Sequence, residues 1–391
     1  MIRSKLFIYW LCVFIVAAFI LINSQFKSTN DDSNYYTDQV LRAQGQNWQF
    51  ALTPKWGINY YSYDPTSYMR DQLPGQLLMG LAVSKLGIPA RHALHLLEMI
   101  FQLLSLFLLV QIACQFLTYE NSSVLFYAII LTPMAFSYNL RANHEVGVMF
   151  FCFLSLYAGL KLSSSKYWGI VTILSSVMVL FIKGPFFIFT LALTSIGHYF
   201  SQERASFKTL SYTLFLSLLV VAFSAYGFEL LFLKITGLSF FSEFYKIQIQ
   251  QRAMQITKEH SFIVQKILNF YYYFYHYLIY SLVWSLITFI VIIKNFLKNG
   301  FRTKLASFLK SPLSNCFLLS SFVFCLFFAM SDRTATRYVF PAYYLFSAWV
   351  IFLLYHLSAD FRKIHLRVTK WGLHFVAPSL WFLAFALHFR N

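Results

Sequence analysis

Charge is scarce in this sequence: only 12% of its 391 residues are Asp, Glu, Lys or Arg, whereas 59% are hydrophobic and 20% are aromatic. A soluble globule of this length cannot bury that much apolar surface, so the composition excludes a purely soluble protein. Stretches near the ~20 apolar residues that a membrane span requires recur from Leu6 to His388. The sequence therefore predicts an all-α polytopic membrane protein, with residues 1–391 forming a single transmembrane domain.

Cysteine and the common catalytic motifs are also scarce or missing. The five cysteines lie in apolar stretches without paired spacing or a neighbouring His cluster, which predicts neither a disulfide framework nor a zinc site. The sequence has no glycine-rich nucleotide loop, no HExxH and no GxSxG, so it gives no support to a soluble nucleotide cofactor or a serine hydrolase. No cofactor is predicted with certainty, and we expect any sugar donor to be a lipid.

Basic residues are in excess, and the formal net charge is +17. In a soluble protein this charge would suggest a nucleic-acid partner. Here the Lys and Arg residues lie in loops between apolar stretches rather than on one face, so they report orientation across the membrane. We therefore expect no nucleic-acid partner.

About eleven transmembrane helices are predicted, and the number depends on residues 76–90. This stretch is apolar but shorter than a bilayer is thick, and Gly80, Lys85, Gly87 and Pro89 interrupt it. We therefore expect it to be an interfacial helix in the first outer loop. The spans are then expected at residues 6–23, 92–117, 122–140, 146–162, 167–182, 184–200, 208–233, 267–293, 312–330, 338–357 and 371–388.

The basic clusters at 294–310 and 362–370 decide the orientation. With the N-terminus in the cytoplasm, both clusters are cytoplasmic, in agreement with the positive-inside bias. The loop 24–91, the segment around Glu145 and the loop 236–266 then face outward, and we expect no soluble C-terminal domain. The prediction is a multi-pass protein of the cell (inner) membrane whose active site is extracytoplasmic.

Acidic residues are the first candidates for chemistry. Asp31 and Asp32 are adjacent where the chain leaves the first span, and a carboxylate beside a like charge at a low-dielectric boundary suits a general base. The alternative is a solvated pair that caps a loop helix. Glu145 opens a later span, where it is either catalytic or an acid favoured at a helix start. A divalent cation on these oxygen ligands is a further alternative, although no spacing demands a metal.

Cationic residues are candidates for phosphate binding. Lys183 stands in a Lys-Gly-Pro break between two apolar runs, where it either faces a phosphate or carboxylate or snorkels at a helix end. Arg252 and Arg337 lie in outer loops, and a guanidinium matches phosphate oxygens; the alternative is anchoring in the headgroup layer. The run from Phe270 to Tyr275 is typical of an interfacial aromatic belt, and the alternative is the floor of a sugar site.

Taken in chain order, these motifs resemble the GT-C-type membrane glycosyltransferases, in particular the lipid A aminoarabinose transferases and the protein O-mannosyltransferases. In those families the first outer loop opens with an acidic pair followed by Tyr, similar to Asp31-Asp32 with Tyr35 or Tyr36 here. A later acidic residue and a Lys-Gly-Pro motif resemble Glu145 and Lys183-Gly184-Pro185. The resemblance implies that the acidic residues are catalytic.

The second half of the chain continues the resemblance. A Gln-Arg setting contains Arg252, and Arg337-Tyr338 precedes Pro341. The resemblance implies that donor-phosphate contacts are made by Lys183, Arg252, Arg337 and Tyr338. The basic residue usual beside the proline of the first loop has only approximate counterparts here, Lys55 and Arg70.

The predicted function is transfer of a hexosyl or pentosyl group from a polyprenyl-phosphate donor, with inversion, on the outer face of the membrane. The expected partners are the donor, membrane lipid and a glycolipid, polysaccharide or protein acceptor, as in lipopolysaccharide or protein glycosylation. The alternative is a lipid-linked oligosaccharide flippase, or a polysaccharide polymerase or ligase. A flippase needs polar cavity residues on both faces, whereas the polar features here collect on one side, which favours the transferase.

Overall fold

The computed structural model describes residues 31–46, 48–55, 67–70, 72–129, 132, 144–201, 206–246, 262–330 and 336–371. Within these ranges the chain is helical and forms no strand; one isolated antiparallel bridge pairs Lys55 with Tyr68. Five helical stretches are long and apolar enough to cross a membrane, and one bent helix pair brings the number to six. The all-α polytopic fold is thus confirmed. The number eleven stays a prediction, because the spans expected at 6–23 and 371–388 lie outside the described residues.

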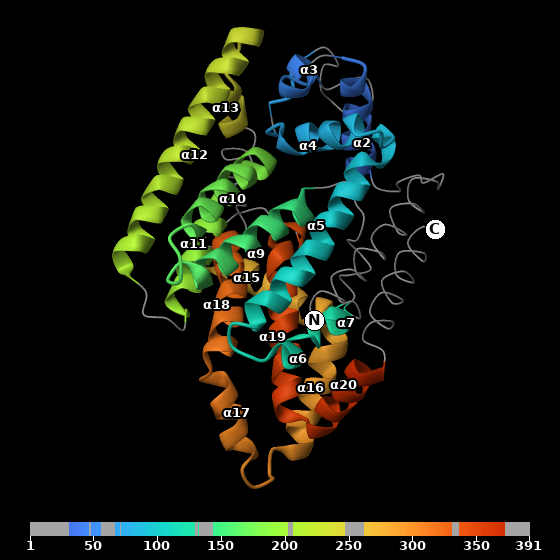
Figure 1. Ribbon diagram of the computed structural model, residues 1–391, viewed down its shortest axis with the longest axis vertical. Coiled ribbons are helices and arrows are strands. Elements are labelled where there is room, and N and C mark those ends of the chain that lie inside the picture. Colours follow the sequence, from blue (N-terminus) through green and yellow to red (C-terminus); the bar gives the residue numbers. More distant parts are fainter. Residues whose placement is uncertain are drawn as a thin grey trace.

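Three helices from residues 31–85 lie at one end of the bundle (Figure 1): α2 (Asp31–Gln44), α3 (Trp48–Leu52) and α4 (Gly75–Lys85). With 11 residues, α4 is only about 16 Å long, against a hydrocarbon core of about 30 Å. It therefore does not cross the bilayer, as the sequence predicts. A Cβ at Gly75 would lie 2.6 Å from the backbone of Phe181, so α4 begins in direct contact with the end of α10.

Helices α10 (Trp168–Lys183) and α11 (Phe187–Tyr199) are joined by the short 3-10 turn η2 (Gly184–Phe186). Together they form a single apolar run long enough for one span, but they are folded back on each other. Hydroxyl pairs cross between them, with Thr172 3.3 Å from Thr194 and Ser176 2.6 Å from Thr190. Because the two pairs run in opposite order, α10 and α11 are antiparallel, as the separate spans predicted at 167–182 and 184–200 require.

Glycine allows α9 (Glu145–Lys161) to approach α11 at backbone distance. A Cβ at Gly159 would lie 2.2 Å from the carbonyl oxygen of Thr194, and a Cβ at Gly197 would lie 2.3 Å from that of Leu156. Small residues permit this packing between helices in a membrane, where apolar burial alone gives little preference for one partner. Helices α9 and α11 therefore pack with their backbones in direct contact.

The core of the second half consists of α18 (Pro312–Ala329) and α19 (Phe340–Leu357), packed against α15 (Phe262–Tyr280). The single span expected at 267–293 is in fact two helices, because α15 and α16 (Leu282–Asn295) meet at 87°. The bend falls at Ser281, whose hydroxyl donates to the carbonyl oxygen of Tyr277 at 2.7 Å. Such back-bonding by Ser is a recognised cause of helix bending.

The long helix α12 (Phe207–Thr236) lies along the outside of the bundle (Figure 1). Its 30 residues reach about 45 Å, and most of its large apolar side chains are exposed, which suits a lipid-facing surface. Its C-terminal end packs on α13 (Phe240–Phe244) through a cluster of phenylalanines that includes Phe232 and Phe240. This cluster covers the end of α10.

Basic residues gather at the other end of the bundle. There α6 (Tyr119–Ser122), α17 (Phe301–Leu309) and α20 (Ala359–Trp371) lie together (Figure 1). Helix α19 joins the two ends: the 3-10 turn η4 (Thr336–Val339) precedes it and α20 follows it. The 18 residues of α19 separate the ends by about 27 Å.

Candidate functional site

A buried ion pair lies where α9 begins and α10 ends. Lys183 Nζ is 2.8 Å from Glu145 Oε1, and the two side chains are 15% and 6% exposed. Glu145 is the first residue of α9 and Lys183 the last of α10, so the packing of these helices joins residues 38 apart in sequence. Each charge depends on the other, because removing one would leave its partner unpaired in a site of low dielectric.

Lys183 also faces aromatic rings from two further elements. Its Nζ lies 5.2 Å from the centroid of Phe186 in η2 and 5.6 Å from that of Tyr338 in η4. The guanidinium carbon of Arg337 lies 6.0 Å from the same Tyr338 ring. These are cation–π distances. The structure thus brings together four residues predicted from sequence to belong to one site: Glu145, Lys183, Arg337 and Tyr338.

Gly184 sets the direction in which the chain leaves Lys183. Its φ of 59° and ψ of −120° match the first central position of a type II′ turn, which only glycine adopts without strain. A Cβ here would also lie 2.7 Å from Cζ of Phe244 in α13. Pro185 follows within η2, where its fixed φ suits the start of a helical turn. The Lys-Gly-Pro sequence therefore ends α10 and turns the chain into α11.

Helix α2 reaches this site through Tyr36. The Tyr36 hydroxyl lies 2.8 Å from Nε2 of His144, the residue before α9, and the ring centroids are 4.6 Å apart. The same hydroxyl donates to the side-chain oxygen of Gln72. Burial and the positive charges of Lys183 and Arg337 lower the pKa of His144 to about 3, although Glu145 opposes this shift. His144 is therefore neutral near pH 7.

Asp31 and Asp32 form the first turn of α2, because the helix begins at Asp31. Asp32 precedes Tyr36 by four residues, which is one helical turn and about 6 Å along the axis. The side chains of both aspartates lie outside the described part of the structure. Their role as general base stays a prediction. Tyr36 ties their helix to His144, the residue before Glu145.

Glu98 of α5 (Ala90–Ala113) is a member of this site that the sequence interpretation missed. It is buried, and Gln76 Nε2 lies 3.4 Å from its Oε1. It interacts electrostatically with Glu145 and Lys183. The signal was present: a carboxylate inside an apolar span is by default a functional candidate.

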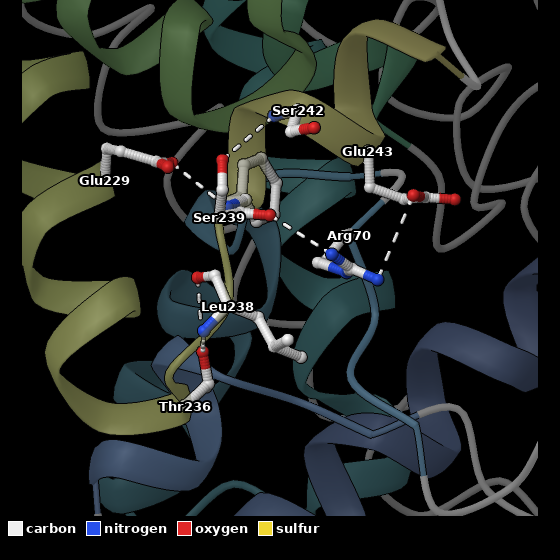
Figure 2. Close-up of polar contacts among 8 residues, drawn as sticks. Arg70, Glu229, Thr236, Leu238, Ser239, Ser242 and Glu243 are labelled. Carbon is white, nitrogen blue, oxygen red and sulfur yellow. Dashed lines mark hydrogen bonds and ion pairs between the residues drawn. The ribbon is translucent and has the colours of Figure 1, made fainter.

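Arg70 and Lys55 lie in the segment between α3 and α4 and make contacts of a different kind. Arg70 donates to the Ser239 carbonyl oxygen at 3.2 Å and lies 3.9 Å from the carboxylate of Glu243, so it ties this segment to α13 (Figure 2). The ammonium of Lys55 lies 5.3 Å from the ring centroid of Tyr68. Both residues therefore stabilise the arrangement of this segment; a phosphate contact by either stays a prediction.

Three further predictions concern Arg252, the aromatic run and a divalent cation. Arg252 lies outside the described residues. The aromatic run is divided between two environments, because Tyr273 and Tyr277 are buried in the core while Tyr271 and Tyr275 are exposed on the helix surface. In the part of the chain that the structure describes, no three His, Cys, Asp or Glu side chains are grouped as metal ligands. The expectation of a divalent cation stays a prediction.

The fold and the buried ion pair define the class: a polytopic α-helical membrane protein with a polar site at one end of its bundle. No family model matches the chain, and no curated protein sequence matches it. Solved structures of the same fold include those of ArnT from Cupriavidus metallidurans, a lipid A aminoarabinose transferase of the GT-C type.

Two ArnT structures are similar along most of this chain. The structure bound to undecaprenyl phosphate has a TM-score of 0.66 at 12% identity, and the apo structure has 0.61 at 13%. Each match covers 94% of this chain and 63% of the ArnT chain, so the chain spans somewhat under two thirds of ArnT. At this identity the likeness establishes the fold, and the GT-C-like architecture predicted from the sequence is confirmed.

Proposed function

We propose that this protein is a glycosyltransferase that moves a sugar from a polyprenyl-phosphate donor to an acceptor on the outer face of the membrane, with inversion. The observation that carries the proposal is the gathering of Glu145, Lys183, Arg337 and Tyr338 beside the anchored start of α2. The fold supports it, because an ArnT of this fold was crystallised with undecaprenyl phosphate.

Lys183 and Arg337 would hold the phosphate of the donor. An ammonium has three N–H donors, and Glu145 uses one of them, so Lys183 retains donors for phosphate oxygens. As the bond from the anomeric carbon to the phosphate oxygen breaks, negative charge grows on the leaving polyprenyl phosphate, and fixed cations stabilise that charge. The leaving group is stable as an anion, so it requires cations rather than a general acid.

Asp31 or Asp32 would act on the attacking side. The acceptor hydroxyl oxygen forms the new bond to the anomeric carbon, and its proton passes to the carboxylate. For a phosphate acceptor no base is required, and the carboxylates would instead orient the acceptor or stabilise an oxocarbenium-like centre, as paired acids do in glycosidases.

The orientation of the protein is part of the proposal. The site and the basic helices α17 and α20 lie at opposite ends of α19. If the basic end is cytoplasmic, as the positive-inside bias favours, the ion pair and the start of α2 face the outer side. Cysteine-accessibility labelling at Ser307 and Ser67 in intact cells would test this assignment, because only an outward residue would react with an impermeant reagent.

The test of activity is transfer by the purified protein in lipid nanodiscs. Radiolabelled undecaprenyl-phosphate pentoses and hexoses are supplied with a membrane extract, and label leaving the donor is followed. We expect transfer by the wild type, and losses of at least about a hundredfold in Asp31→Asn/Asp32→Asn, the range for removing a general base. The matched control is Asp38→Asn, in the same helix but paired with Arg42. Full transfer by the double variant would refute the assigned base, and binding of every donor without consumption would refute the transferase.

A further inference from the structure

A cavity lies at the basic end of the bundle, away from the Glu145–Lys183 ion pair. Its volume is about 410 Å³, within the roughly 300–1,000 Å³ typical of small-molecule sites. Its lining comes from Asn121 in α6, Ser307 in α17, Leu313 in α18, Tyr355 in α19 and Arg362 in α20. The cavity thus lies at the level where α18 begins and α19 ends, which is the depth of a membrane interface.

One wall of the cavity is polar and contains a single guanidinium, that of Arg362. Tyr355 donates to Oδ1 of Asn121 at 2.6 Å, and the Ser307 hydroxyl lies 3.3 Å from Nε2 of His356. These neutral groups therefore satisfy one another. Arg362 is half-buried, and within the described ranges no carboxylate lies at ion-pair distance from it. A half-buried guanidinium in such a position favours an anionic ligand with oxygen acceptors.

Part of the lining is apolar. Phe308, Leu313 and Phe352 line the same cavity, and all three side chains are themselves buried in the core. A free inorganic anion would gain nothing from these side chains, whereas a hydrocarbon chain would gain about 25 cal/mol for each Å² of apolar surface removed from water. A guanidinium that shares a cavity with buried apolar side chains therefore matches an amphiphile with an anionic head.

The surroundings of the cavity add to its positive charge. Exposed on α17 and α20 are Arg302, Lys304, Lys363 and Arg367, while Glu120 of α6 and Asp360 of α20 are the acidic residues near them. Basic pockets between transmembrane helices at such an interface bind anionic lipid headgroups. Because these basic residues outnumber the acidic ones, they would raise the local concentration of anionic lipids in the leaflet at this end of the bundle.

We propose that this cavity binds an anionic phospholipid, with Arg362 donating to its phosphate oxygens and an acyl chain lying against Phe308 and Phe352. The site is distinct from the Glu145–Lys183 site and does not depend on the transferase proposal. Its chemistry selects a lipid with a net negative charge over a zwitterionic one, because the basic residues of α17 and α20 disfavour a headgroup cation.

Native mass spectrometry of the protein in detergent tests the proposal, with phosphatidylglycerol and phosphatidylcholine as matched probes. We expect tighter binding of phosphatidylglycerol, and a loss of about fivefold in its affinity in Arg362→Gln, the effect of one basic residue at a lipid surface. Arg362→Lys keeps the charge and should recover most of the affinity. Lys363→Gln removes the same charge from the exposed face of α20 and should change it less than twofold.

Three outcomes would overturn the inference. Equal losses of phosphatidylglycerol affinity in Arg362→Gln and Lys363→Gln would show that only the overall positive charge at this end of the bundle matters. Equal binding of the two lipids would refute the selection for a net negative headgroup. Displacement of phosphatidylglycerol by millimolar inorganic phosphate would assign the cavity to a soluble anion. If Arg362→Gln alone fails to fold, the comparison of Arg362→Lys with Lys363→Gln decides, because a loss greater in Lys363→Gln contradicts the site.

Discussion

Glu98 and Glu145, two buried carboxylates from different helices, meet at the first turn of α9. Glu98 of α5 interacts electrostatically with Glu145 and with Lys183, while Glu145 binds Lys183 directly. Glu98 Oε1 also accepts from the Gln76 amide of α4 at 3.4 Å. The side chain from α5 thus joins α4 to the start of α9.

This relationship predicts different effects for two substitutions of Glu98. Glu98→Leu removes the acceptor of the buried Gln76 amide and should lower the free energy of unfolding by about 1–3 kcal/mol, the cost of an unsatisfied buried donor. Glu98→Gln retains an acceptor oxygen at the same place and should lose less than half as much. Unfolding in detergent, followed by circular dichroism, measures both. Equal losses would show that Glu98 does not hold Gln76 of α4.

The ion pair predicts a non-additive double-mutant cycle. Lys183→Met leaves Glu145 charged and unpaired in a buried site, so we expect a loss of about 3–5 kcal/mol in the free energy of unfolding. Adding Glu145→Gln should restore a large part of that stability, since no unpaired charge remains, while transfer activity stays lost. Lys166→Gln, which removes an exposed cation, is the control. Additive losses in the double variant would contradict the coupling.

Replacing Gly184 should lower the free energy of unfolding, and Gly237 serves as the comparison. Gly184→Ala must place a Cβ 2.7 Å from Phe244 and adopt φ 59°, whereas Gly237 has φ 73° and open space around it. Gly237→Ala should therefore cost about 1–2 kcal/mol of unfolding free energy, the backbone strain alone. Gly184→Ala should cost about 1 kcal/mol more than that. Thermal unfolding of the two variants side by side measures the difference, and equal costs would mean that Phe244 yields freely.

The neutral state of His144 predicts a dependence of stability on pH. The pKa of His144 in the folded protein is about 3, below its unfolded value of about 6.5, so the unfolded chain binds the proton first. The contribution of neutral His144 to the free energy of unfolding is complete above about pH 6.5. It is lost as the pH falls below that value, by about 2 kcal/mol between pH 7 and pH 5. His144→Gln should remove this part of the slope when unfolding is measured at both values. An unchanged slope would show that His144 is protonated in the fold.

Local signals in the sequence were sufficient for the elements with short-range causes. The Lys-Gly-Pro break predicts two helices from one apolar run, and the antiparallel pair α10 and α11 confirms it. The interruptions around Lys85 predict a short helix outside the bilayer, and α4 has that length. Both depend on glycine and proline, whose backbone limits are local.

Features that depend on packing were not predictable in the same way. Nothing in a single sequence pairs Glu145 with Lys183, because the distance between them is set by how α9 and α10 pack. The bend between α15 and α16 falls at Ser281, a residue that many straight helices contain. The aromatic run Phe270–Tyr275 predicts an interfacial belt or the floor of a sugar site, but successive residues of a helix point 100° apart, so Tyr273 is buried in the core while Tyr271 and Tyr275 are exposed.

The glycines at the α9–α11 contact also limit how this protein can move. A shift of one helix along the other by a single turn would replace glycine with a residue that has a side chain, against a carbonyl oxygen only 2.2 Å from where a Cβ would stand. Sliding of that pair by one turn would bring a side chain against this oxygen, so the contact holds Glu145, at the start of α9, in a fixed position in the bundle. Movement around the ion pair is then left to elements that pack on this frame, such as α12 and the helices α2, α4 and α13.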